Sequence, residues 1–495
     1  MLSFKFFKTL SNLLLLPLLL NAQSPANQDS IDHFLLNKMG EKKIPALQLA
    51  VIKDGKVVKN ATYGIANLEN NIKATDESIF SINSITKAFT GVAVMQLVEA
   101  GKLKLSDPLS KHLEHLPAEW RNITLQQVLT HTSGLPDMDG SDGMIMGKGD
   151  ETLAMAEITK MPIDFKPGEK FSYNQTGYVL IGQIITKLTG MHFTKFIETR
   201  QFDVAGMKLT RFGDSYDVVP NSAGAYTLTK QKGESFIRNE SPGVAYIQFP
   251  AFYRTAAGIL STATDMAQWV IALKTGKLLK EKSSIDAMWT PAILNNGKIG
   301  GFNRLTNGYA IGWPTVTREE HPAVAPVGGG RSAVFMYLKD DLSIIVLSNL
   351  MAGNPDQFID EIAGFYIPDM KAKNGFGLSS ALKKLNAALQ RTGFDKGAKV
   401  LVDLKKADTG FEVSERELNG WGYQLLAQKR FKEALSIFKL TVAQHPKSSN
   451  AYDSLAEMFE ILELPQEALQ AYKKSYALDA SNKNAANRIA ALSGN

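Results

Sequence analysis

Short runs of alternating apolar and polar residues occur in two separate parts of the chain, and this alternation predicts β-strands. The first part contains residues 46–52 and 56–66, which Asp54-Gly55 joins as a hairpin turn. The second part contains predicted strands at residues 309–313, 332–338 and 342–348. Strands at both ends with helices between them favour a single antiparallel sheet that the two ends of the domain complete.

Helical periodicity fills the sequence between these strands. Residues 84–100 predict the clearest single helix, an amphipathic one that Gly101 ends, with apolar positions at Phe89, Val92, Met95, Leu97 and Val98. The period continues through residues 125–208, most clearly at 179–189 and 193–199. These segments predict an all-helical insertion beside the sheet. The expected fold class is therefore α+β.

The last part of the chain has a different organisation. Residues 368–378 are polar and glycine-containing, as in a linker, and residues 379–391 form a predicted helix. Further on, similar residues recur 34 positions apart, and the matched pairs are Glu433 and Glu467, Leu435 and Leu469, Phe438 and Tyr472, and Gly422 and Ala456. A period of 34 is typical of tetratricopeptide helix pairs.

Two such units, at residues 418–446 and 451–479, precede a predicted closing helix at 482–492. Stacked helix pairs usually need about three repeats for a stable core, so we expect this region to pack on the 379–391 helix or on the preceding domain. Its function is either to bind a peptide or protein partner in a groove or to act as a structural cap.

The chain has 495 residues, more than one core usually supports. The patterns divide it into a signal peptide at 1–22, an α+β domain at 28–367, a linker with a helix at 368–417 and tetratricopeptide-like repeats at 418–495.

The N-terminal segment has the pattern of a secretory signal peptide. Lys5 and Lys8 precede an apolar run at residues 13–20, which is too short, and too broken by Pro17, for a stable membrane span. We expect cleavage after Ala22, and a retained anchor is the alternative. Because the chain has no cysteine, disulfides, thiolate catalysis and a lipid-modified cysteine are excluded. The expected location is the periplasm or outside the cell.

Charge and metal-ligand patterns exclude other classes of function. The formal net charge is +6 at pH 7, and the basic residues are dispersed, which argues against nucleic-acid binding. No cluster of His, Asp and Glu has metal-ligand spacing. Asp137, Asp139 and Asp142 share one loop, but their spacing does not match a calcium loop, and a solvated loop is the better interpretation. The sequence therefore indicates no metal and no other cofactor.

Ser84 and Lys87 open the predicted helix at 84–100 and share one of its faces. At this end the helix dipole would stabilise an alkoxide forming on Ser84. The spacing alone is weak evidence, since Ser380 and Lys383 have it too. The neighbouring motifs must decide whether the pair is an active site.

Several motifs follow Ser84 in a specific order. They are Ile123-Thr124-Leu125, Leu129-Thr130-His131-Thr132-Ser133-Gly134-Leu135, Pro167-Gly168-Glu169, Phe171-Ser172-Tyr173-Asn174-Gln175, Gly258-Ile259-Leu260-Ser261-Thr262 and Val327-Gly328-Gly329-Gly330. In this order the chain resembles the serine β-lactamase and penicillin-binding-protein superfamily, most closely its class C β-lactamase, D-alanyl-D-alanine carboxypeptidase and esterase branch. The resemblance covers roughly residues 30–365. It implies a β-lactamase/transpeptidase-like sheet flanked by helices.

The resemblance also implies roles for individual residues. Ser84 would be the nucleophile, and Lys87 and Tyr173 would handle its proton. A cationic Lys87 would lower the pKa of Tyr173, whereas a neutral Lys87 could itself accept the proton, and both alternatives stay open. The backbone N–H groups of Ser84 and Gly329 would stabilise the oxyanion. In this superfamily His131 would be structural.

The chain departs from the superfamily pattern in two motifs. Where the pattern has tyrosine, any residue and asparagine, this chain has Tyr173-Asn174-Gln175, which keeps the amide with one more methylene. Where lysine or histidine normally precedes a small residue and glycine, it has Pro326-Val327-Gly328, so the cation is absent. That loss puts β-lactam and D-alanyl-D-alanine recognition in doubt. Arg331 is a candidate replacement that would bind a substrate carboxylate, and Gln175 and Gly328 are further expected substrate-binding residues.

The first functional hypothesis is an exported serine hydrolase that forms an acyl-enzyme at Ser84 with ester or amide substrates. The lost cation favours an esterase or D-Ala-type peptidase over a β-lactamase. The alternative is a catalytically degenerate domain that binds ligands while the repeats recruit a partner. The expected partners are a small-molecule or peptide substrate and a protein at the repeats, with no nucleic acid and no membrane span after signal cleavage.

Overall fold

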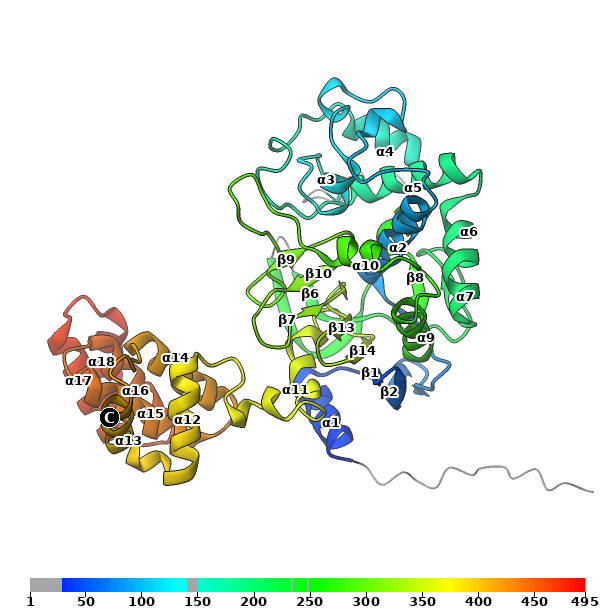
Figure 1. The fold of residues 1–495 in the computed structure, drawn as a ribbon. Helices are drawn as coiled ribbons and strands as arrows, with labels where there is room; N and C mark the ends of the chain where they lie inside the picture. Colours follow the sequence, from blue (N-terminus) through cyan, green and yellow to red (C-terminus); the bar gives the residue numbers. More distant parts are fainter. Residues whose placement is uncertain (1–28, 140–149, 233–234, 247–248, 495) are drawn as a thin grey trace, which may run out of the picture.

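The computed structural model describes residues 29–139, 150–232, 235–246 and 249–494. The predicted signal peptide lies outside these ranges. An α+β body is followed by an all-helical C-terminal region, so the predicted fold class is confirmed (Figure 1). No helix within the described ranges is long and apolar enough to cross a membrane.

The main sheet is antiparallel, with the strand order β3-β2-β1-β14-β13-β11-β10-β9, and β12 pairs with β13 beside this path. Its centre is formed by β1 (Ala46–Lys53), β13 (Ser332–Tyr337) and β14 (Leu342–Ser348). β1 pairs with β2 (Lys56–Asn67) on one side and with β14 on the other. The two ends of the domain therefore complete one sheet, as the sequence predicted.

One predicted strand is wrong. Residues 309–313 contain the end of β9 (Gly308–Tyr309) and the turn of a hairpin in which β9 pairs with β10 (Pro314–Val316). Gly312 adopts a φ of 81° at the turn, and a Cβ there would overlap the Lys87 carbonyl oxygen. The apolar run resembled a strand because the whole hairpin is buried. The shorter strands of this sheet are β3 (Ile72–Lys73), β11 (Ala323–Val324) and β12 (Val327–Gly328).

Both faces of the sheet are covered, which explains why its central strands are almost continuously apolar. On β14, Ile344 and Val346 belong to the core with α1 (Ser30–Lys42) and α11 (Ile359–Ala363). Ile345 and Leu347 alternate with them and belong to the core of the helical subdomain. This period of two sets which face of the sheet each residue enters.

The helical subdomain surrounds α2 (Thr86–Glu99), which is buried on nearly every side. The amphipathic interpretation of this segment is therefore wrong, because other elements pack all around it. Phe89 stacks on Trp269 with ring centroids 3.9 Å apart, and Trp269 stacks on Trp313. The surrounding helices are α3 (Leu125–Leu129), α4 (Glu151–Ile158), α5 (Thr176–Thr189), α6 (Phe193–Ile197), α7 (Asp203–Ala205), α8 (Arg254–Ala257), α9 (Ala263–Lys274) and α10 (Lys282–Trp289).

Two small sheets were not predicted. A three-stranded sheet has the order β4-β8-β5, formed by β4 (Phe80–Ser81), β8 (Ile259–Ser261) and β5 (Arg211–Phe212). Between β5 and β8, the strands β6 (Tyr226–Lys232) and β7 (Ser235–Val244) form a separate hairpin. The three-stranded sheet matters for function because β4 leads directly to Ser84.

The C-terminal region is a stack of helices at the lower left of Figure 1. Its helices are α12 (Ser380–Thr392), α13 (Gly397–Ala407), α14 (Glu415–Ala427), α15 (Phe431–Gln444), α16 (Ser449–Ile461), α17 (Pro465–Leu478) and α18 (Lys483–Ser493). The first residues of α14, α16 and α18 are 34 positions apart, which is the period found in the sequence. α12 and α13 share one core with α14 and α15. The assignment to tetratricopeptide repeats remains a prediction.

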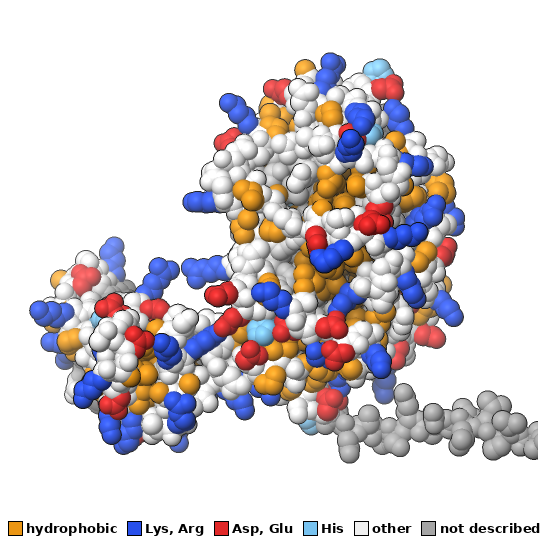
Figure 2. All heavy atoms as spheres, in the orientation of Figure 1, with side chains coloured by type: hydrophobic (Ala, Val, Ile, Leu, Met, Phe, Trp, Pro, Cys, Tyr) orange, Lys and Arg blue, Asp and Glu red, His pale blue; other side chains and the backbone are white. Residues whose placement is uncertain are grey.

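Charged side chains are scattered over both parts of the molecule on the face that Figure 2 shows, without one continuous basic surface.

Candidate active site

Ser84 lies in a short 3₁₀ turn, η1 (Asn83–Ile85), that runs straight into α2. The hydroxyl of Thr86 donates a hydrogen bond of 2.7 Å to the Asn83 carbonyl and accepts one of 3.1 Å from the N–H of Ile259 on β8. This side chain therefore ties the turn to the three-stranded sheet. Ser84 is held at a junction between a helix and two sheets, which limits its movement.

The Pro326-Val327-Gly328 segment, which is the third motif of the superfamily pattern, closes this junction from the other side together with the residues that follow it. Ser332 on β13 donates a hydrogen bond of 2.8 Å to the Ile82 carbonyl, and a Cβ at Gly328 would overlap the same carbonyl oxygen. Gly328 therefore lets β12 lie directly against the segment before Ser84. Gly329 follows with a φ of 55°, and a Cβ there would lie 3.0 Å from the Asn83 side chain. The structure thus brings Gly329 next to the residue preceding Ser84.

Lys87 is fully buried and its ammonium group lies between polar partners. Its Nζ is 3.5 Å from the Ser84 Oγ, 2.7 Å from the Gln175 Oε1 and 3.0 Å from the Ala256 carbonyl oxygen. The same nitrogen lies 4.7 Å from the centroid of the Tyr173 ring. Three segments of the sequence, around Ser84, Tyr173 and Ala256, therefore meet at one nitrogen atom.

Burial lowers the pKa of Lys87 to about 7, although the charges of Asp137 and Asp139 oppose this shift. Desolvation disfavours the charged form of a lysine, and here no ion pair within the described residues compensates for it. A substantial fraction of Lys87 is therefore neutral at pH 7. A neutral amine can accept a proton, which an ordinary surface lysine does not do at this pH.

Aromatic rings pack around Tyr173 on one side of the Ser84, Lys87 and Gln175 cluster. Tyr173 packs against His131 with ring centroids 4.4 Å apart and against Phe302 at 5.0 Å, and Tyr309 packs against His131 at 4.5 Å. Burial raises the pKa of the Tyr173 phenol above its usual value, and interactions with Ser84 and Gln175 partly oppose that rise. Tyr173 is consequently a protonated phenol at neutral pH, beside both Ser84 and Lys87.

His131 supports the segment around Tyr173, and none of its hydrogen bonds within the described residues involves Ser84. Its Nδ1 accepts a hydrogen bond of 3.1 Å from the Asn174 N–H, and its carbonyl accepts one of 2.9 Å from the Ser172 N–H. Burial, with a contribution from Lys87, holds the pKa of His131 well below its usual range, so the ring is neutral. This arrangement agrees with the expected structural role.

Asp137 is a site residue that sequence reasoning missed. Its Oδ1 accepts a hydrogen bond of 2.8 Å from the Gln175 N–H, so the interpretation as part of a solvated loop is wrong for this residue. Burial raises its pKa, and its charge acts on Lys87. Asp139 is exposed, and Asp142 lies outside the described residues. Only the position of Asp137, two residues after the motif that ends at Leu135, could have indicated its role.

Arg331 does not join the Ser84 cluster. It follows Gly330 in the turn between β12 and β13, and its side chain enters a separate pocket that Asn83 borders. The structure therefore unites Ser84, Lys87, Tyr173 and Gln175, places Gly328 and Gly329 beside them, and directs Arg331 elsewhere.

An antiparallel sheet completed by both ends of the domain, with a serine and a buried lysine at the start of a central helix, defines a β-lactamase-like protein. The chain belongs to this family: the Beta-lactamase family model matches residues 31–366.

Relatives support the same assignment. The chain is 28% identical to the protein flp of Staphylococcus aureus (strain N315) over 334 residues, which cover 66% of this chain and 63% of flp. It therefore spans less than two thirds of flp. It is also 30% identical over 274 residues to the putative penicillin-binding protein PbpX of Bacillus subtilis (strain 168), covering 52% of this chain and 66% of that protein.

Solved structures with the same fold include the octameric penicillin-binding protein homologue from Pyrococcus abyssi. That structure has a TM-score of 0.58 and 25% sequence identity, and the match covers 72% of this chain and 80% of that chain. The D-amino acid amidase from Ochrobactrum anthropi SV3 has a TM-score of 0.57 at 22% identity, covering 68% of this chain and 97% of that one. The second likeness shows the fold alone.

Proposed function

We propose that this protein is an exported serine hydrolase that forms an acyl-enzyme at Ser84 with small ester or amide substrates. The observation that carries the proposal is the buried Lys87, whose Nζ lies 3.5 Å from the Ser84 Oγ and whose pKa is lowered to about 7. A structural lysine would have no reason to be desolvated beside a serine hydroxyl.

Lys87 is the better candidate for the general base. A neutral amine has two N–H groups, and the Gln175 Oε1 and the Ala256 carbonyl are in place to accept both. The lone pair then remains for the Ser84 hydroxyl. Tyr173 is less suited to be the base, because its pKa is raised above the usual value and a phenolate would be rare.

The proposed reaction has two halves. As the Ser84 Oγ bonds to the substrate carbonyl carbon, its proton moves to Lys87 Nζ, and the N–H groups of Ser84 and Gly329 donate to the oxyanion. The bond to the leaving oxygen or nitrogen then breaks, and the Tyr173 hydroxyl passes a proton from Lys87 to that atom. Water, activated by the neutral lysine, subsequently hydrolyses the ester on Ser84 and restores the free enzyme.

The substrate class follows from what the third motif lacks. Pro326 and Val327 supply no cation beside the cluster, and Arg331 enters a neighbouring pocket. This favours an esterase, or a peptidase with small or uncharged substrates, over a β-lactamase. The predicted signal peptide supports export to the periplasm or outside the cell. The C-terminal helices remain candidates for a partner-binding groove or a structural cap.

The decisive experiment exposes the purified chain separately to a fluorophosphonate, p-nitrophenyl acetate and a penicillin, and follows intact mass and turnover. We expect a fluorophosphonate adduct and rapid ester turnover in the wild type, and neither in Ser84→Ala. Ser380→Ala is the matched control, because Ser380 and Lys383 have the same spacing on α12. This variant should react like the wild type.

A stable penicilloyl adduct on Ser84 would instead assign a penicillin-binding activity. The absence of every adduct and of turnover would favour the alternative, a catalytically degenerate binding protein. That alternative has support from the missing cation of the third motif.

A further inference from the structure

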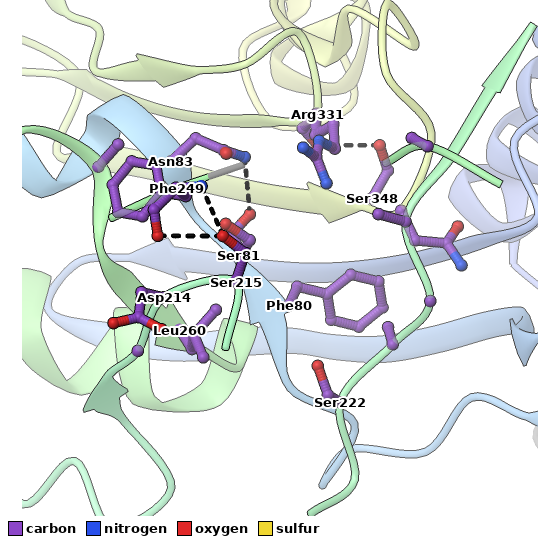
Figure 3. A pocket seen from close by; sticks show the side chains of 17 residues that line it. Phe80, Ser81, Asn83, Asp214, Ser215, Ser222, Phe249, Leu260, Arg331 and Ser348 are labelled. Carbon is purple, nitrogen blue, oxygen red and sulfur yellow. Dashed lines mark hydrogen bonds between the residues drawn. The ribbon is translucent and has the colours of Figure 1, made fainter. Parts of the chain in front are cut away.

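A separate cavity of about 210 Å³ lies beside η1, the turn that contains Ser84 (Figure 3). Phe80 and Ser81 of β4, Asn83 of η1, and Ser348 at the end of β14 line it, whereas Ser84, Lys87 and Tyr173 do not. Its other walls come from the segments at residues 213–215 and 222–225. The cavity therefore borders the active site through Asn83 but is a different space.

Arg331 enters this cavity as an isolated buried cation. The residue is 6% exposed, and its Nε is buried with no hydrogen-bond partner. Within the described ranges, the guanidinium group forms no ion pair and no hydrogen bond. Its backbone, by contrast, is well fixed, since the Arg331 carbonyl accepts a hydrogen bond of 2.9 Å from the Ser348 hydroxyl.

Other arginines of this protein show what is missing. Arg318 donates two hydrogen bonds to the carboxylate of Asp360, at 2.7 and 2.9 Å. An arginine keeps its charge even when buried, and an unpaired buried charge is costly. A buried guanidinium without a carboxylate is therefore a group that a ligand can satisfy.

The one acidic side chain in the lining does not fill this role. Asp214 forms an ion pair of 3.0 Å with Arg254, and in Figure 3 it lies on the side of the pocket away from Arg331. Its charge is thus already matched. The lining keeps one uncompensated positive charge, and its other polar groups are uncharged serine and asparagine side chains.

We propose that this cavity is a binding site for a small carboxylate, which the Arg331 guanidinium binds through two hydrogen bonds. Planar carboxylates match the geometry of a guanidinium, which donates two parallel hydrogen bonds to them. A cavity of about 150 Å³ accommodates benzene, so about 210 Å³ suits a carboxylate of roughly benzoate size. The Phe80 side chain supplies an apolar surface for the body of such a ligand.

The carboxylate has two conceivable sources, a substrate that also reaches Ser84 and a free small acid. Both share the chemistry that Arg331 recognises. Binding itself does not depend on the proposed function, since neither Ser84 nor Lys87 lines the cavity. If Ser84 proved not to form an acyl-enzyme, the carboxylate site would be unaffected, and binding can be measured in Ser84→Ala.

The test is calorimetric titration of the full chain with benzoate and with benzamide, its uncharged isostere. We expect benzoate to bind at least about tenfold more tightly than benzamide, and Arg331→Gln to abolish this preference. Arg211→Gln is the matched control, because the Arg211 Nε also lacks a partner but lies outside the cavity. Equal binding of the two ligands, or unchanged benzoate binding in Arg331→Gln, would overturn the proposal.

A second variant keeps the test valid if Arg331→Gln does not fold. Ala225 lines the cavity, so Ala225→Leu should exclude benzoate while acetate still binds; benzoate binding as in the wild type would count against the assigned cavity. Competition then identifies the source. Benzoate that raises KM only for esters carrying a carboxylate indicates a substrate subsite, and benzoate that binds without competing indicates a site for a free acid.

Discussion

The buried ammonium group of Lys87 donates a hydrogen bond of 2.7 Å to the side-chain carbonyl of Gln175. The two residues are far apart in the sequence, and Gln175 is held by the bond between its N–H and Asp137. The longer side chain of glutamine, compared with the asparagine of the superfamily pattern, still reaches the lysine. Gln175 is therefore a partner of the proposed base, and this contact leads to the first prediction.

Gln175→Glu should shift the pH dependence of hydrolysis to higher pH. The change places a carboxylate about where the Gln175 Oε1 lies, and a negative charge beside an ammonium raises the pKa of Lys87 by about 1–3 units. The acid limb of kcat/KM for p-nitrophenyl acetate should move by a similar amount. An acid limb at the wild-type pH would show that Lys87 is not the base. Gln175→Met, which adds no charge, serves as the control.

Asp137→Asn should shift the same profile in the opposite direction. The Asp137 charge raises the pKa of Lys87, so its removal leaves more of the lysine neutral at a given pH. Asparagine can keep the hydrogen bond from the Gln175 N–H, which limits structural change. The expected result is an acid limb at lower pH than in the wild type, measured with the same ester. A shift to higher pH would contradict the assigned electrostatic role.

The wild-type profile itself tests the state of Lys87. Below its pKa of about 7 the lysine carries a proton and cannot act as a base. We expect kcat/KM to fall about tenfold for each pH unit below that value and to level off above it. Lys87→Arg stays charged at every accessible pH, so its rate of hydrolysis should be about 10²–10⁴-fold lower than that of the wild type. The range from about pH 5 to about pH 9 extends about two units on either side of the Lys87 pKa. A kcat/KM that stays constant over this range would contradict a titrating base.

Gly312→Ala should destabilise the domain and disturb the site together. A Cβ at Gly312 would overlap the Lys87 carbonyl, and φ is 81° there. We expect a loss of about 1–3 kcal/mol in the free energy of unfolding, measured with urea, and reduced ester turnover. Gly101→Ala separates backbone strain from atomic overlap. Gly101 follows α2, the helix that carries Lys87, and has a φ of 68° with open space around it. Equal effects of the two variants would mean that backbone strain alone is responsible.

The C-terminal helices give a stability prediction with a control on the same helix. A Cβ at Gly422 would lie 2.7 Å from the Phe438 ring, whereas one at Gly420 would meet nothing within 4 Å. Gly422→Val should therefore cost about 1–3 kcal/mol of unfolding free energy, while Gly420→Val should change it by less than about 0.5. Circular dichroism during urea unfolding measures both. A double variant with Phe438→Leu should recover part of the loss.

Much of the architecture was readable from local patterns. The hairpin at Asp54-Gly55, the central strands and the 34-residue period are all patterns along the sequence, and the structure has each of them. The errors occurred where burial overrides periodicity. Residues 309–313 and the helix after Ser84 are buried on nearly every side. Their sequence therefore does not distinguish a strand from a hairpin, or an inner face from an outer one.

The sequence by itself determined the family motifs and therefore the identity of Ser84, Lys87, Tyr173 and Gln175 as a set. Only the tertiary structure decided that Lys87 is desolvated beside Ser84, that Asp137 holds Gln175, and that Arg331 enters its own cavity. The reason is physical. Residue type and spacing record which groups are available, whereas a pKa or an unpaired charge depends on what surrounds a group in three dimensions, and those neighbours come from distant segments.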